Sequence, residues 1–247
     1  MLNRGGQEPE DIGGTMPDNW DDIASWWITE AAADPTYPFD VNPVLADLLP
    51  GPVGTLLDLG CGEGQTMPLV QGRVIGIDLS FALAAAAARN GDVVVSMLPD
   101  LGTFKEASVD GAYSIYLLDL IRDHEAFFGE TARVVRPGGT LVIIINHPVF
   151  TAPGSVPLMD ADGEVLWRWG TYFERGSSLE PAGHRDIRYY HRPLGDLLTA
   201  AAAAGWRLDR LIERGLSPEA IAVLPGYEGQ ERIPRLLGVR WQRDDRP

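Results

Sequence analysis

The sequence predicts an α/β fold in which a mostly parallel sheet carries helices on both faces. Three observations support this prediction. From residue 55 onward, short apolar runs alternate with helical segments, which is typical of doubly buried strands joined by crossover helices. A glycine-rich turn follows the first run directly. There are seven such runs, five before Pro148 and two nearer the C-terminal end, so we expect a seven-stranded, Rossmann-like sheet.

The N-terminal part precedes the first strand. Residues 1–17 are rich in Gly, Pro and acidic residues and are predicted to form a mobile tail. An amphipathic helix over about 18–30 follows, with Asp18 as its candidate N-cap. Its stripe is unusually aromatic and comprises Trp20, Ile23, Trp26 and Trp27. We expect this helix to act as a lid, and a short helix to follow around Pro43–Leu49.

The sheet elements follow in alternating order. The first five predicted strands are Thr55–Leu59, Val74–Asp78, Val93–Met97, Gly111–Ile115 and Thr140–Asn146. The helices predicted between them are Gln65–Val70, Phe81–Arg89 and His124–Val135, the last followed by a stop signal at residues 136–139.

Apolar periodicity disappears after the fifth strand for about 45 residues. Loops of this length in compact domains are usually lids or binding insertions, so region 148–193 is predicted to cap the substrate. Regular structure resumes with a predicted helix and two strands at Leu194–Ala204, Trp206–Glu213 and within Leu236–Gln242. Residues 18–247 are therefore expected to form a single domain.

Composition excludes several classes of protein. A formal net charge of -15 over 247 residues argues against nucleic-acid binding, because that binding depends on Lys and Arg. One cysteine excludes a disulfide framework and a cysteine-built zinc site, and we expect no metal. Without an apolar run of about 18 residues or a signal-peptide pattern, the chain is expected to be cytoplasmic and not membrane-bound, as a monomer or homodimer.

The most informative stretch is Leu56-Leu57-Asp58-Leu59-Gly60-Cys61-Gly62-Glu63-Gly64. Glycines permit a sharp turn and close approach of a ligand, and Asp78 ends the next strand, where an acid suits ribose hydroxyls. The spacing differs from the dinucleotide pattern. Two carboxylates at this turn, Asp58 and Glu63, would repel a pyrophosphate but tolerate a sulfonium with an ammonium tail.

Through four stretches the chain resembles the class I S-adenosylmethionine-dependent methyltransferases. The resemblance is to their small-molecule branch, which includes ubiquinone and menaquinone methyltransferase-like proteins with a type 11 methyltransferase domain. They are LLDLGCGEGQ at 56–65, VIGIDLS at 74–80, VDGAYSIYLL at 109–118 and RVVRPGGTLVI at 133–143. The resemblance implies S-adenosylmethionine as cofactor and S-adenosylhomocysteine as product.

The resemblance also implies roles for individual residues. Gly60 and Gly62 would line the methionine part of the cofactor, Asp58 would support the turn, Asp78 would bind the ribose, Leu79 would pack on the adenine, and the backbone near Ile115 would meet the amino group. Ser96 or Met97 stands where the family often has an acid for the adenine, and Trp27 stands where it often has Tyr in the N-terminal helix. Cys61 is expected to be a small turn residue beside the cofactor rather than a nucleophile, because nothing nearby supplies a base.

Candidate catalytic and substrate residues come from segments that reach the same crevice. Methyl transfer by direct displacement needs alignment, plus a base if the nucleophile carries a proton. His147, directly after the fifth strand, and His191, before the returning helix, are candidate bases; alternatively, each only holds local structure. Substrate contacts are predicted at Tyr116, Asp119, Trp26 and Tyr190, although Asp119 could instead cap the following helix and the aromatic residues could form a small core.

The sequence thus predicts methylation of an oxygen or nitrogen of a small molecule, for example a specialised metabolite. Two alternatives stay open. One is carbon methylation of a quinone-like ring, and the other is a non-catalytic adenosylmethionine-binding protein.

Overall fold

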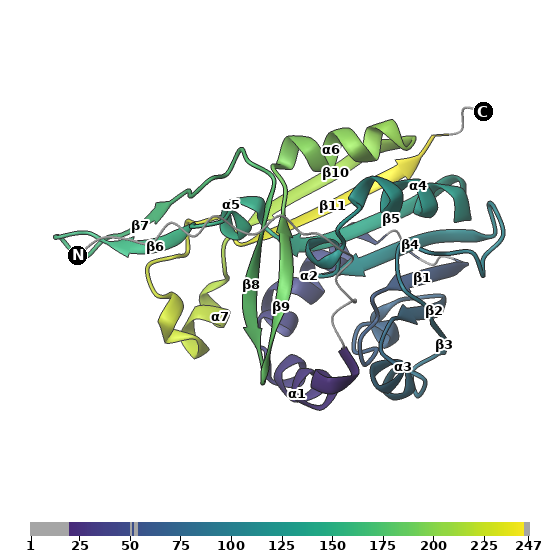
Figure 1. The fold of residues 1–247 in the computed structure, drawn as a ribbon, viewed down its shortest axis with the longest axis horizontal. Coiled ribbons are helices and arrows are strands. Elements are labelled where there is room, and N and C mark those ends of the chain that lie inside the picture. The colour runs from purple at the N-terminus through teal and green to yellow at the C-terminus, as the bar shows by residue number, and fades with distance from the viewer. Residues whose placement is uncertain (1–19, 50, 52–53, 245–247) are drawn as a thin grey trace, which may run out of the picture.

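The computed structural model describes residues 20–49, 51 and 54–244. The predicted tail at 1–17 and the candidate cap Asp18 lie outside these residues. Within them, one central sheet runs through the molecule, helices pack on both of its faces, one hairpin projects from one end, and a second hairpin crosses in front of the sheet (Figure 1).

The sheet has seven strands in the order β10-β11-β5-β4-β1-β2-β3. Their bounds are β1 Thr55–Leu59, β2 Arg73–Asp78, β3 Asp92–Val95, β4 Val109–Ile115, β5 Val135–Asn146, β10 Trp206–Arg214 and β11 Leu236–Arg243. The first five strands pair in parallel, while β11 is antiparallel to both β5 and β10. The predicted seven-stranded, mostly parallel sheet is confirmed.

Alternating side chains of the central strands fill two separate cores. Leu141 and Ile143 of β5 join Phe127 and Phe128 of α4 (His124–Val134), whose face is also covered by α6 (Leu194–Ala203). Val142 of β5 points to the other face, against α2 (Asn42–Leu48) and the preceding π-helix η1 (Tyr37–Val41). Burial on both faces explains why these strands read as continuous apolar runs.

The boundaries of the three helices predicted between the first five strands need correction. The helix expected at Gln65–Val70 is only a 3₁₀ turn, η2 (Met67–Leu69), because Gly64 at φ 78 turns the chain and Pro68 lacks an amide donor. The helix expected to reach Val135 ends at Val134, and the stop signal lies within β5, at an irregularity in its pairing with β4. The helix α3 covers Phe81–Ala87, two residues shorter than predicted.

The region after β5 contains more regular structure than the sequence indicated. It begins with a short helix, α5 (Pro148–Thr151), and continues as two antiparallel hairpins formed by β6 Val156–Met159, β7 Val165–Arg168, β8 Gly176–Ala182 and β9 Arg185–His191. Most of these strand residues are partly or fully exposed, so the strands lack the apolar alternation that marks a half-buried strand. In Figure 1 the β8–β9 hairpin crosses in front of the sheet and ends beside α1 (Trp20–Ala33).

The remaining short helices are η3 (Leu118–Leu120), α7 (Pro218–Val223) and η4 (Pro225–Tyr227). None of the helices in the described part of the chain has the length and apolarity needed to cross a membrane.

Candidate active site

A cavity of about 590 Å³ lies where the carboxyl ends of β1, β2 and β4 meet. Its walls come from the glycine turn after β1, the ends of β2 and β3, the segment after β4, the helix α1 and the β8–β9 hairpin. The volume is within the range usual for small-molecule sites. The predicted site residues that line it are Trp27, Gly60, Gly62, Asp78, Leu79, Ser96, Met97, Ile115, Tyr116 and Tyr190.

The glycine turn forms one wall of the cavity. Gly60 and Gly62 adopt φ values of 72 and 54, a left-handed conformation that glycine adopts without strain. The amides of Gly60 and Cys61 both donate to the carbonyl of Ile77, at 2.8 and 3.0 Å. These bonds join the turn to the end of β2, so the exposed backbone of the turn faces the cavity.

Asp78 ends β2 and connects the two parts of this wall. Its Oδ2 accepts from the Gly62 amide at 2.8 Å, and its Oδ1 accepts from the Ser80 amide at 2.9 Å. Burial raises the pKa of Asp78, while these backbone hydrogen bonds lower it. A carboxylate held in this way keeps further lone pairs toward the cavity, as a pair of ribose hydroxyls requires.

Asp58 and Cys61 lie behind the turn and do not line the cavity. The Asp58 carboxylate accepts from the Tyr113 hydroxyl at 2.8 Å and from the Thr66 hydroxyl at 3.4 Å. Burial raises the pKa of Asp58 to about 7. Cys61 packs on Gly76, where an added Cβ would lie 2.7 Å from its sulfur, and burial raises the pKa of its thiol. Asp58 therefore supports the turn, and Cys61 is a packing residue.

The predicted adenine side is largely apolar. Leu79, Met97 and Leu98 line it, and Met97 has 54% of its surface exposed. Ser96 donates its hydroxyl to the carbonyl of Asp100 at 3.1 Å. Its hydroxyl is therefore used within its own loop, and the acid that the family often has here has no direct equivalent.

The helix α1 covers the cofactor side of the cavity. Trp20 and Trp27 line the cavity and pack edge to face at a centroid distance of 5.6 Å. Hydrogen bonding from the Trp27 side chain lowers the pKa of the buried Glu63, although burial raises it more strongly. Asp21 joins α1 to the start of α3, because its carboxylate accepts a hydrogen bond from the Ser80 hydroxyl and another from the Ala82 amide at 3.0 Å.

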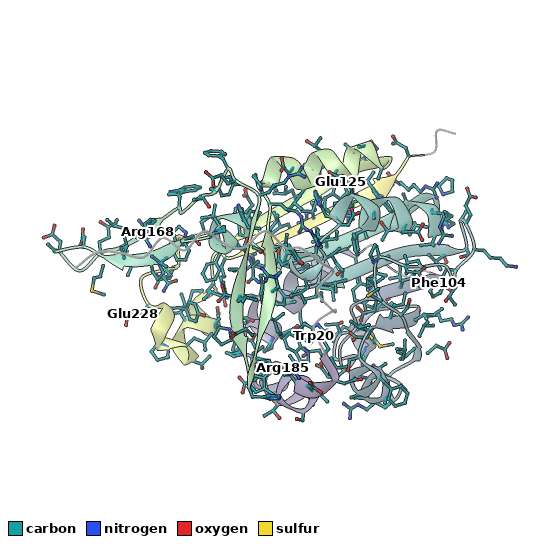
Figure 2. The ribbon with its side chains drawn as sticks, viewed as in Figure 1. Trp20, Phe104, Glu125, Arg168, Arg185 and Glu228 are labelled. Atoms are coloured by element: carbon teal, nitrogen blue, oxygen red, sulfur yellow. The ribbon has the colours of Figure 1, made fainter. Side chains whose placement is uncertain are left out.

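The tip of the β8–β9 hairpin closes onto α1. Arg185 pairs with Asp22, and Figure 2 shows Arg185 at the tip of the hairpin, beside the helix that begins at Trp20. Trp26, predicted to contact substrate, instead packs on the hairpin: a Cβ at Gly183 would lie 3.0 Å from its ring. Its ring belongs to a small core with Ile23 and Ile187, so it connects lid and cap.

The far wall of the cavity is formed by the segment after β4 and the inner face of the hairpin. Tyr116 has φ 55, rare for a residue with a side chain, and its amide is held by the carbonyl of Ile144 at 2.8 Å. Tyr190 lies opposite on β9. Sequence reasoning missed Arg188, Leu120 and Leu179, because the hairpin that brings two of them to the cavity was not predicted. Residues 185–191 show too little apolar alternation to indicate a strand.

Asp119 is buried beside this wall rather than in it. It has 6% of its surface exposed, and its Oδ2 has no hydrogen-bond partner within the part of the chain that is described. Burial raises the pKa of Asp119 to about 7, against the charge of Arg192 and hydrogen bonding from Asn146. The capping alternative is wrong, because Asp123 caps α4 by accepting from the Ala126 amide.

Neither candidate base lines the cavity, and the geometry corrects this expectation. His147 caps α5: its Nδ1 accepts from the Val149 amide at 3.1 Å, which leaves Nε2 to donate to Glu213 at 2.7 Å. His191 donates from Nε2 to the carbonyl of Tyr172 at 2.8 Å, and its Nδ1 bonds the Thr151 hydroxyl. Both rings are buried with both nitrogens occupied, so they fix the segment between β5 and α6 instead of facing a substrate.

Among the residues described, no three His, Cys, Asp or Glu side chains gather into a group that could hold a metal ion. The wall around Asp78 fits an adenosyl cofactor. It combines one carboxylate held by backbone amides, an apolar strip for the base, and a glycine turn whose backbone is accessible.

Comparison with known proteins agrees with this fit. A family model described as a methyltransferase domain matches residues 57–143. The chain is 34% identical over 95 residues to a trans-aconitate 2-methyltransferase from an Azoarcus species, which covers 36% of this chain and 38% of that protein. It is 27% identical over 132 residues to a ubiquinone biosynthesis O-methyltransferase of Xanthomonas oryzae, covering 48% of this chain and 54% of that one. The matched regions thus span about half of these relatives or less.

A solved structure extends the likeness beyond the matched core. The S-adenosylmethionine-dependent methyltransferase from Mesorhizobium loti superposes with a TM-score of 0.71 at 26% identity, covering 81% of this chain and 96% of that one. The glycine turn, the Asp78 carboxylate, the sheet order and the matched family model all agree. Residues 57–143 therefore match a methyltransferase domain, and the fold around them resembles that of an S-adenosylmethionine-dependent methyltransferase, whose cofactor fits the cavity beside Asp78.

Proposed function

We propose that this protein methylates an oxygen atom of a small molecule, such as a specialised metabolite, inside the cavity that α1 and the β8–β9 hairpin close. The observation that carries the proposal is the continuity of this cavity. It runs from the glycine turn and Asp78 to a wall that contains Tyr116, Arg188 and Tyr190. A substrate on that wall would lie beside the methionine end of the cofactor.

The chain's own residues have three tasks in this mechanism. S-adenosylmethionine supplies the electrophilic methyl group when bound. Gly60, Gly62 and Asp78 orient it, Trp20 and Trp27 cover it, and the far wall aligns the acceptor. Alignment is the main contribution, because an in-line displacement needs the reacting atoms at contact distance. The lid and the cap exclude water from the reacting groups.

The cavity favours an acceptor oxygen that is already ionised at neutral pH. No histidine of the described residues lines the cavity. Burial raises the pKa of Tyr116 far above its ordinary value, so its phenol can donate a hydrogen bond but cannot act as a base. Asp123 uses one carboxylate oxygen to cap α4. A carboxylate or an acidic phenol needs no base and fits these walls better than a protonated amine.

Titration calorimetry with S-adenosylhomocysteine, followed by transfer of a labelled methyl group to a panel of small acids and phenols, tests the proposal. We expect binding and transfer to oxygen. Product NMR separates oxygen from nitrogen and from the ring carbon of a quinone-like acceptor. Tight binding of NAD without binding of S-adenosylhomocysteine would sink the cofactor assignment. Cofactor binding without transfer to any acceptor would support the non-catalytic alternative.

A further inference from the structure

A partly buried arginine outside the described cavity, Arg235, has no ionic partner among the described residues. Arg235 precedes β11, and its Nη1 is buried without a hydrogen-bond partner. It forms no ion pair within 4 Å in the part of the chain that the structure describes. Burial lowers the pKa of Arg235. Such a group destabilises a folded protein unless something neutralises it, because removing a charge from water is costly.

The guanidinium of Arg235 is held rigidly despite this lack of an acceptor. It lies 3.5 Å from the centroid of the Phe150 ring, and Phe150 in turn stacks on Trp167 at 5.1 Å. Stacking occupies the flat face of a guanidinium and leaves its N–H donors, which lie in the plane at its edge, for other partners. The result is a preorganised fork of donors of the kind that binds carboxylates in a bidentate manner.

The backbone around Arg235 is fixed as firmly as its side chain. Its amide donates to the carbonyl of Arg214 at 2.7 Å, and its carbonyl accepts from the His147 amide at 2.9 Å. His147 also caps α5, the helix that carries Phe150. The histidine that sequence analysis nominated as a base therefore positions both the arginine and the ring on which it stacks.

The surroundings place this arginine next to the substrate wall. Tyr116, which lines the cavity, is the group whose charge raises the pKa of Arg235 most, and Tyr189 of the cap also contributes. The two carboxyl groups whose charges interact with Arg235 are committed elsewhere. Asp34 accepts from the amide and hydroxyl of Thr36, and the charge of Arg192 acts more strongly on Asp119 than that of Arg235 does.

From this geometry we infer a carboxylate-binding subsite at Arg235, adjoining the cavity at Tyr116, which recognises a carboxylate of the methyl acceptor. This inference rests on the proposed function. The bound carboxylate is a recognition group and not the methylated one, because pairing with a guanidinium withdraws charge from the oxygens and makes them poor nucleophiles. The substrate class is thus a small organic acid that carries a second, ionised oxygen.

Arg192 provides a matched comparison. It is more deeply buried than Arg235, but its guanidinium donates to the carbonyls of Leu118, Ile121 and Arg122. The N–H donors of a structural arginine are bonded to protein carbonyls in this way, whereas those of an arginine that binds a ligand are left without a protein acceptor. Replacement by methionine should therefore affect the two positions in opposite directions. Arg192→Met should lower the melting temperature, and Arg235→Met should leave it unchanged or raise it.

The binding test uses two acids and their neutral amides as probes: benzoate with benzamide, and 4-hydroxybenzoate with 4-hydroxybenzamide. Calorimetry on the full chain, with and without S-adenosylhomocysteine, should show at least one acid bound about tenfold or more tightly than its amide. Arg235→Met should abolish that preference, and Arg235→Lys should retain part of it. Affinity for S-adenosylhomocysteine should stay unchanged in both variants.

Two results would overturn the subsite: no acid preferred over its amide in the wild type, or the preference retained in Arg235→Met. A fall in melting temperature of Arg235→Met equal to that of Arg192→Met would assign Arg235 to the structure of the fold. If Arg235→Met does not fold, the preference is measured on Arg235→Lys, where an unreduced value overturns the subsite. If the wild-type protein does not bind S-adenosylhomocysteine, that result instead contradicts the proposed function. Failure of the subsite and failure of the proposed function are therefore distinguishable.

Discussion

The buried carboxyl group of Asp119 makes a prediction about stability that depends on pH. Its pKa is raised from 3.8 to about 7 by burial. Between these values the folded chain holds a proton that the unfolded chain has released, so the free energy of unfolding falls as pH rises. The stabilising proton is fully present below the unfolded pKa and is lost as pH rises through the folded pKa.

The magnitude follows from the shift. One pH unit inside the window corresponds to about 1.4 kcal/mol, so a rise from about pH 5.5 to about pH 8 lowers the stability of the wild type through this group by about 2 kcal/mol. Asp119→Asn cannot ionise and lacks this loss. Its stability relative to the wild type should therefore increase by about 2 kcal/mol over the same range.

Urea unfolding followed by circular dichroism at both pH values measures this difference. Asp110→Asn is the control. The pKa of Asp110 is lowered, first by the Thr55 amide and then by Arg136. The ionised Asp110 therefore contributes its full stabilisation of the fold at every pH above the pKa that it has in the unfolded chain. That variant should lose the same stability at both pH values. A pH-independent difference for Asp119→Asn, or one of opposite sign, would refute the assignment of a raised pKa.

Three further predictions concern the site. Asp78→Asn should weaken S-adenosylhomocysteine binding by about 10- to 100-fold in calorimetry, because one charged acceptor of hydrogen bonds is lost; an unchanged affinity would remove Asp78 from the cofactor site. His147→Ala should lower the stability by about 1 kcal/mol through loss of the α5 cap, and His147→Asn should restore part of that stability. In His147→Ala, kcat should change little while KM rises. A kcat near zero in the folded His147→Ala variant would show that His147 is a base. Gly183→Ala should lower the melting temperature more than Gly163→Ala, since both have positive φ, at 64 and 83, but only the first would press a Cβ against Trp26; equal effects would contradict closure of the hairpin onto the lid.

The cofactor half of the site could be predicted from sequence because its residues lie close together along the chain. The turn from Asp58 to Gly64 follows one buried strand, and Asp78 ends the neighbouring one, so parallel pairing brings them to one edge. Local spacing and one topological rule were sufficient. The fold was predictable for the same reason, since each strand of the parallel sheet is buried on both faces.

The substrate half could not be predicted in this way, because its geometry depends on contacts between distant segments. Residue type indicates that a histidine can titrate, but not that His147 lies with both nitrogens bonded beneath the end of β5. Arg235 lies in a segment without periodicity, and its significance depends on the position of Phe150 in another element. The hairpin that carries Tyr190 has too little apolar alternation to be recognised.

The strongly acidic composition also changes meaning when the local charges are known. A net charge of -15 argues against anionic substrates only through the field far from the protein, which salt screens beyond about 10 Å. Near the far wall the chain also carries cations, since Arg188 lines the cavity, Arg192 follows β9 directly, and Arg235 lies over the Phe150 ring. A low dielectric strengthens these nearby charges relative to the distant ones. An organic acid would therefore be repelled weakly on approach and held strongly once it is under the hairpin. The sign of the protein's net charge thus does not determine the sign of the substrate's charge.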